Sequence, residues 1–245
     1  YARNAIFSGL MPSEMEKHHP NLWVNENDKR GKNLNEKSFL MSQLKRNQLN
    51  LKFNYSKITN LKAGRDLVAQ IQNYQNEDLF VVVYNFVDMI SHAKTNMEII
   101  KELASDNKAF RSLTLSWFKN SPLLEIIQKA SELGFKLVVT TDHGTINVDQ
   151  AIEVIGTRET STNLRYKTGQ SMSFKGKEVL EIKEPNKLKL PSANLNSKYI
   201  FAKEQGYFVY QNNFNHFANH FRNTFQHGGI SMEEMIIPFI VMHPR

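Results

Sequence analysis

The stretch Ser121-Pro-Leu-Leu-Glu-Ile-Ile-Gln-Lys-Ala-Ser-Glu-Leu-Gly-Phe-Lys-Leu-Val-Val-Thr-Thr141 combines the signals of a helix and a strand. Ser121 as the cap and Pro122 as the first helical residue predict where the helix begins. Gly134 predicts where it ends. Residues 135–141 are mostly apolar, which predicts a strand buried on both faces. A helix followed by a buried strand is half of a βαβ unit, so this stretch favours a mostly parallel sheet covered by helices.

A second run of the same kind, Leu-Phe-Val-Val-Val-Tyr-Asn-Phe, fills residues 79–86 with seven apolar side chains and one Asn. It predicts another strand buried on both faces. We expect an α/β fold with a mostly parallel central sheet flanked by helices, in which polar insertions form a cap. The other predicted helices span residues 1–8, 36–48, 64–73, 97–104, 108–118 and 212–224, and the other predicted strands span residues 51–58, 206–210 and 235–241.

The domain prediction is a single domain over residues 1–245, with cap insertions at 10–60 and 155–205. Residues 155–205 are rich in Thr, Ser, Asn and Lys, which indicates loops rather than a core layer. The chain starts at Tyr1 without a Met, and its first helix ends at Gly9 as at a C-terminal cap. We therefore expect a larger protein with an upstream part.

Composition narrows the chemistry. Cysteine is absent from the 245 residues, which excludes disulfides, thiolate zinc sites and cysteine nucleophiles and fits the cytoplasm. The net charge of +7 suits a polyanionic partner. No apolar run approaches the roughly 18 residues of a membrane span, so we expect no membrane insertion.

Asp88-Met-Ile-Ser-His92 directly follows the strand predicted at 79–86. If a helix begins there, the spacing of four places both side chains on one face. The ends of buried strands are where open α/β sheets bind ligands. The alternative is that Asp88 caps a helix and His92 lies on the surface.

Asp142 and His143 follow the strand predicted at 135–141, and Gly144 allows the backbone to turn sharply enough for them to share one ion. The alternative is an Asp/Gly turn with an incidental His.

His227 precedes two glycines in Gln226-His-Gly-Gly-Ile-Ser-Met-Glu-Glu234. Ser231 and Glu234 have the spacing of a capping box. A loop-to-helix junction therefore explains the glycines, the serine and the glutamate, but it does not explain His227.

The motif order, Asp-x-x-x-His, then Asp-His-Gly, then a late His-Gly-Gly-x-Ser, resembles the PglZ domain of the alkaline phosphatase superfamily. The opening Asn-Ala-Ile-Phe-Ser-Gly resembles the helix after the nucleophile in that superfamily. The phrases Tyr84-Asn-Phe-Val-Asp-Met and Thr224-Phe-Gln-His-Gly-Gly-Ile-Ser-Met-Glu-Glu are most similar to PorX-type response regulators. The resemblance covers essentially the whole chain.

The resemblance implies a site with two metal ions, usually zinc. One ion would be held by Asp88, His92 and His227, and the other by Asp142 and His143. Manganese also fits His and carboxylate ligands. By the spacing of the family, a Thr or Ser nucleophile is expected a couple of residues upstream of Tyr1, together with an upstream Asp ligand and a receiver domain.

The resemblance also implies the reaction: a two-metal hydrolysis of phosphoric esters. We expect a phosphodiesterase acting on nucleotides or short oligonucleotides, with Arg165 and Lys167 binding substrate. A solvated basic loop is the alternative for these two residues. As the output domain of a two-component response regulator linked to type IX secretion, it would form a homodimer and meet a histidine kinase or a sigma factor. The rival functions are a signalling module whose metal site is structural or senses a nucleotide, and a phosphomutase.

Overall fold

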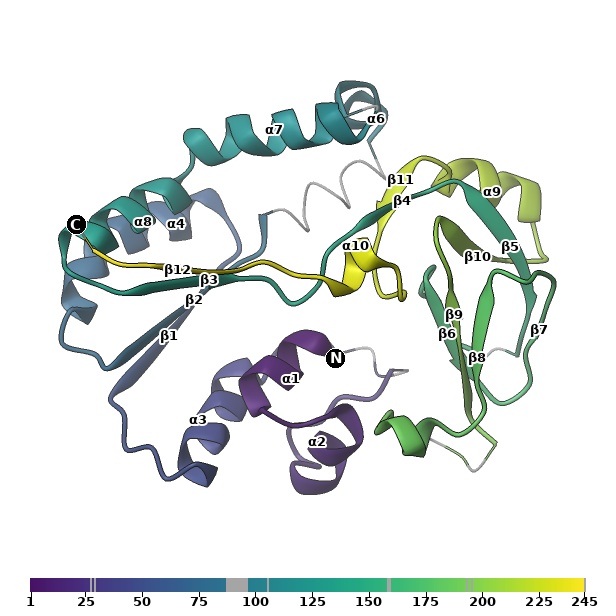
Figure 1. The fold of residues 1–245 in the computed structure, drawn as a ribbon, viewed down its shortest axis with the longest axis horizontal. Coiled ribbons are helices and arrows are strands. Elements are labelled where there is room, and N and C mark those ends of the chain that lie inside the picture. Colours follow the sequence, from purple (N-terminus) through teal and green to yellow (C-terminus); the bar gives the residue numbers. More distant parts are fainter. Residues whose placement is uncertain are drawn as a thin grey trace. The chain divides into compact units, whose positions relative to one another are not determined.

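The computed structural model describes residues 1–26, 28, 30–86, 97–104, 106–157, 160–192, 194 and 196–244. The chain forms two compact units, each assembled from two separate stretches (Figure 1). Unit 1 contains Tyr1–Gln48 and Asp142–Ile237, and unit 2 contains Leu49–Thr141 and Pro238–Arg245.

Unit 2 holds two pairs of strands. Strand β1 (Phe53–Ile58) runs parallel to β2 (Leu79–Tyr84), and β3 (Leu137–Thr140) runs antiparallel to β12 (Phe239–Met242). The helices of this unit are α4 (Leu61–Gln70), α6 (Glu98–Leu103), α7 (Asn107–Lys119) and α8 (Pro122–Glu132), with the 3-10 helix η1 (Ile71–Tyr74) after α4.

Polar caps explain where two of these helices begin. The Asn60 side chain accepts a hydrogen bond of 2.9 Å from the backbone N–H of Ala63 at the start of α4. The Asp106 side chain accepts one of 2.7 Å from Ala109 at the start of α7. Each cap satisfies a backbone donor that the helix itself leaves unpaired.

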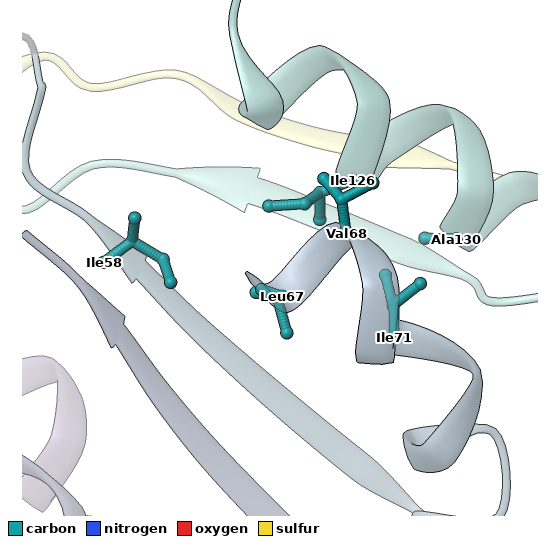
Figure 2. Packing of buried hydrophobic residues seen from close by; sticks show 6 residues of the cluster. All are labelled: Ile58, Leu67, Val68, Ile71, Ile126 and Ala130. Atoms are coloured by element: carbon teal, nitrogen blue, oxygen red, sulfur yellow. The ribbon is translucent and has the colours of Figure 1, made fainter. Parts of the chain in front are cut away.

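The core of unit 2 forms where α4 and α8 pack over the strands. Figure 2 shows its buried side chains, which are Ile58, Leu67, Val68, Ile71, Ile126 and Ala130. Leu67, Val68 and Ile71 lie one and four residues apart, and Ile126 and Ala130 lie four apart. These spacings place the apolar groups of each helix on one face. The stripe predicted from sequence is therefore the face that is buried.

Unit 1 begins with three helices, α1 (Ala2–Ser8), α2 (Pro12–His18) and α3 (Glu36–Arg46). Gly9 ends α1 in the left-handed conformation, with φ 62°, as the sequence predicts. The Arg3 Nε lies 2.5 Å from the Glu36 Oε1 and joins α1 to α3. The remaining helices of this unit are η2 (Pro185–Leu188), α9 (Phe214–Phe221) and α10 (Met232–Met235).

The strands of unit 1 form three small sheets. They are β4 (Ile146–Val148), β5 (Gln150–Ile155), β6 (Tyr166–Gly169), β7 (Ser173–Phe174), β8 (Val179–Ile182), β9 (Lys198–Ala202), β10 (Gly206–Tyr210) and β11 (Thr224–Gln226). Their orders are β10-β5-β7, β6-β9-β8 and β11-β4. A shared apolar core joins the two three-stranded sheets, because Val154, Ile200 and Phe208 are buried in one cluster.

The structure confirms mixed α/β content, but the sheets differ from the expected mostly parallel central sheet. Within the described residues each sheet has two or three strands, and only β1–β2 and β5–β10 are parallel. Residues 155–205, expected as loops, contribute β6 to β9. Their polar composition conceals this layer because some of its buried side chains are charged. The single domain over 1–245 and its cap insertions stay predictions.

No helix in the described part of the chain has the length and apolar character that crossing a membrane requires.

Replacing Ile126 by Ala is expected to destabilise unit 2 by about 2–4 kcal/mol, because the cavity left among α4, α8 and the strands cannot collapse fully. Ile126 is 5% exposed, and Leu115 on α7, at 52%, provides the matched control. Denaturant unfolding should show Leu115→Ala close to wild type. Equal losses in both variants would contradict the core described here.

Candidate active site

Two chain segments that carry predicted ligands are brought together by a short antiparallel strand pair in unit 1. In the pairing of β4 with β11, Gln226 lies opposite Ile146. One residue beyond this pair, the chain reaches Thr145 on one side and His227 on the other. The pairing register therefore places the loop after Asp142 next to the loop that begins at His227.

The two imidazole rings meet at this point. The ring centroids of His143 and His227 are 4.0 Å apart, and their planes are inclined by 14°. The Nδ1 of His143 lies 3.1 Å from the carbonyl oxygen of Gly144. A carbonyl can only accept, so this contact assigns the proton to Nδ1 and leaves Nε2 with its lone pair. That Nε2 lies 3.7 Å from the Oδ2 of Asp142.

This arrangement fits a metal ion held by Asp142 and His143. Metal-binding histidines commonly donate their second ring N–H to a backbone carbonyl, as His143 does to Gly144. Two ligands about 2.0–2.1 Å from one tetrahedral zinc ion lie about 3.4 Å apart, close to the 3.7 Å between the His143 Nε2 and the Asp142 Oδ2. The donor set is nitrogen and oxygen, which suits zinc or manganese.

The predicted partners of His227 cannot be placed. Asp88 and His92 lie outside the described residues. Among the residues that are described, no group of three or more His, Cys, Asp or Glu side chains could hold a metal ion. The two-ion cage is therefore placed here by Asp142, His143 and His227 alone, and the ligand assignments stay predictions.

The loop from His227 to α10 is organised around the Glu234 carboxylate, which is 3% exposed. Its Oε1 accepts a hydrogen bond of 2.8 Å from the Gly229 N–H. Its Oε2 accepts from the N–H of Ser231 at 3.1 Å and from the Ser231 hydroxyl at 2.8 Å. The structure thus confirms the capping box expected from Ser231 and Glu234.

Arg165, predicted to bind substrate, is fully buried and forms a two-pronged pair with Glu234. Its Nε donates to Oε1 at 2.9 Å and its Nη2 donates to Oε2 at 2.8 Å. Its Nη1 donates to the backbone carbonyl of Gly206. The guanidinium therefore has protein partners on both sides, and its role toward substrate stays a prediction.

Burial alone would raise the pKa of the Glu234 carboxyl. The hydrogen bonds and positive charge of Arg165, together with the Gly229 and Ser231 donors, outweigh burial and lower that pKa below its ordinary value. Glu234 is therefore an anion that only accepts hydrogen bonds, as its surrounding donors require.

Glu234 also reaches the other loop of the site through its backbone. Its carbonyl oxygen accepts a hydrogen bond of 2.9 Å from the Gly144 N–H. The backbones approach so closely that a Cβ at position 144 would lie 1.9 Å from the Glu233 carbonyl oxygen. A glycine is required at this position because no side chain fits.

Lys167, the second predicted substrate-binding residue, is 1% exposed on β6. Its Nζ lies 4.4 Å from the centroid of the Tyr210 ring, a cation–π contact. Burial lowers the pKa of its ammonium to about 8. The structure shows a desolvated lysine in place of the alternative of a solvated basic loop, and binding of substrate by Lys167 stays a prediction.

Sequence reasoning assigned Ser231 and Glu234 only to a helix cap. The capping-box spacing was the available signal, but it gives no indication of the distant partner Arg165. The expectation that the aromatic residues of β10 are core residues is confirmed for Tyr207 and Phe208, which are 0% and 1% exposed.

Gly144→Ala is expected to lower the free energy of unfolding by about 1–3 kcal/mol, because the added methyl group overlaps the Glu233 carbonyl. Gly31→Ala is the matched control, since a Cβ there meets only the Leu34 side chain at 3.4 Å. Chemical denaturation of both variants measures the difference. A Gly144→Ala protein as stable as Gly31→Ala would contradict the close backbone contact.

Lys167→Met is expected to raise stability at pH 7, by up to about 3 kcal/mol, because the buried charge is removed. In the wild type, the pKa falls from its ordinary 10.5 in the unfolded chain to about 8 in the folded protein. The folded state releases its proton first, so wild-type stability should recover as pH rises from 8 to 10.5. The advantage of the variant should shrink over this window in thermal unfolding, whereas parallel pH curves would refute the desolvated ammonium.

The sequence was compared with known proteins once this geometry was established. No curated protein matches it. The family model described as the BREX system PglZ alkaline phosphatase-like domain matches residues 1–242. This match spans nearly the whole chain, and it includes Asp142, His143 and His227. The chain therefore belongs to the PglZ family of alkaline phosphatase-like domains.

Proposed function

We propose that this domain is a two-zinc phosphodiesterase acting on nucleotides or short oligonucleotides. The observation that carries the proposal is the Asp142–His143–His227 arrangement, in which His143 has Nδ1 bound to a carbonyl and Nε2 turned to a carboxylate. Family membership supports a phosphoric ester hydrolase. The donor atoms support zinc, with manganese as the second choice.

Each residue has a stated task in this proposal. Asp142 and His143 hold one ion, and His227 holds the other with Asp88 and His92. Two ions bound here supply Lewis acidity to the attacking and leaving oxygens of an in-line displacement at phosphorus. Gly144 keeps His143 oriented, because its carbonyl accepts the Nδ1 proton.

The attacking hydroxyl is proposed to come from a Thr or Ser that precedes Tyr1 in a longer form of the protein. The backbone nitrogen of Tyr1 supports this route into the site. Burial lowers the pKa of its ammonium, while the Glu26 and Asp142 carboxylates act in the opposite direction. Tyr1 therefore lies within the electrostatic field of a proposed metal ligand, where preceding residues would enter.

A polyanionic substrate is supported by the 31 basic residues against 24 acidic ones, because a positive protein attracts phosphodiesters at long range. We further propose that the domain serves as the output module of a PorX-type response regulator. The similarity of the Thr224–Glu234 segment to those proteins is the support for this context.

The decisive test is turnover of bis-(p-nitrophenyl) phosphate and p-nitrophenyl phosphate by the zinc-loaded protein, in a form extended upstream of Tyr1. Asp142→Asn and His227→Gln are each expected to lower diester turnover by at least about 100-fold, because each removes a metal ligand. His216→Gln is the control, since His216 is exposed on α9. It should keep wild-type turnover.

The outcomes separate the candidate functions. Diester turnover lost only in the two ligand variants supports the proposal, and a preference for the monoester replaces it by a phosphatase. Two bound zinc ions without turnover favour a signalling module or nucleotide sensor. A protein that binds no zinc contradicts every metal-dependent reading.

A further inference from the structure

The two loops that bear His143 and His227 share one residue as their support. The backbone carbonyl of Glu234 accepts from Gly144, one residue after His143, at 2.9 Å. The side chain of Glu234 accepts from Gly229, two residues after His227, at 2.8 Å. Displacing Glu234 would therefore release both histidine loops together.

Arg165 holds Glu234 in this place from a different part of the chain. It lies 69 residues away in sequence and reaches both carboxylate oxygens. The contact is tight, because a Cβ at Gly229 would lie 2.7 Å from both the Arg165 Nη2 and the Glu234 Oε2. Gly229 is thus pressed against the ion pair with no room for a side chain.

A buried ion pair is a poor source of stability, since desolvation of both charges offsets most of their attraction. Apolar residues of similar volume often stabilise a protein as well or better. What an apolar pair could not do is accept hydrogen bonds from Gly229 and Ser231. This favours a role in fixing loop geometry over a role in stability alone.

We propose that Arg165 and Glu234 are positioning residues that set the His143 and His227 rings for metal binding before an ion arrives. The inference rests on the proposed function for its purpose, and on the contacts above for its geometry. Second-layer partners of metal ligands act in this way by fixing ring orientation and tautomer. Neither Arg165 nor Glu234 touches the metal or the substrate in this role.

Two variants and a matched control test the proposal. Glu234→Gln removes the negative charge and half of the accepting capacity, while Arg165→Lys keeps the charge but loses the planar fork. Glu36→Gln is the control, because Glu36 is 1% exposed and also pairs with an arginine in unit 1. All three proteins are compared by circular dichroism and thermal unfolding, so that a general loss of stability is measured separately.

The first readout is the nitrogen NMR spectrum of the His143 and His227 rings in the metal-free protein. The wild type should show His143 with its proton on Nδ1, and Glu234→Gln should show a mixture of tautomers. Arg165→Lys should give an intermediate spectrum. The second readout is zinc affinity by chelator competition, which should fall by about 10–100-fold in Glu234→Gln and less in Arg165→Lys.

Unchanged ring signals and zinc affinity in Glu234→Gln would overturn the proposal. Equal changes in Glu36→Gln would overturn it as well, because the effect would then follow stability. If the wild type binds no zinc, the proposed function fails, and the ring spectra still decide whether the pair positions the two histidines.

Discussion

The buried carboxylate of Glu234 is the point on which the candidate site depends. It is deprotonated because Arg165 and several backbone and hydroxyl donors surround it and outweigh the penalty of burial. Its side chain orders the loop after His227 and its backbone orders the loop after His143. One residue in a helix cap thereby connects two segments that lie far apart in the sequence.

The remaining architecture of unit 1 supports this connection. Strands β4 and β11 bring the two loops to the same end of a strand pair, and β6 begins directly after Arg165. Glycines at 144 and 229 permit backbone contacts that no other residue allows. The site is therefore a product of backbone approach as much as of its ligands, and a family motif of Asp-His-Gly and His-Gly-Gly is a record of that requirement.

Much of the secondary structure could be predicted, because local signals determine it. Ser121, Pro122 and Gly134 predicted α8 within its observed limits, and the apolar run at 79–86 predicted β2. The sheet arrangement could not be predicted, since pairing of β3 with β12 joins residues about a hundred positions apart. Likewise the strands within residues 155–205 were hidden, because they bury Arg165 and Lys167 instead of apolar side chains. The ligands Asp142, His143 and His227 were identified from motifs, but the partner of Glu234 gave no signal in the sequence.

Anomalous diffraction at the zinc edge, from crystals of the zinc-loaded protein, tests the metal site most directly. The account predicts a peak about 2.0–2.1 Å from the His143 Nε2 and from a carboxylate oxygen of Asp142, with the Nδ1 still facing the Gly144 carbonyl. A second peak should lie at the His227 ring. Zinc bound through the Nδ1 of His143, or only at sites away from these residues, would contradict it.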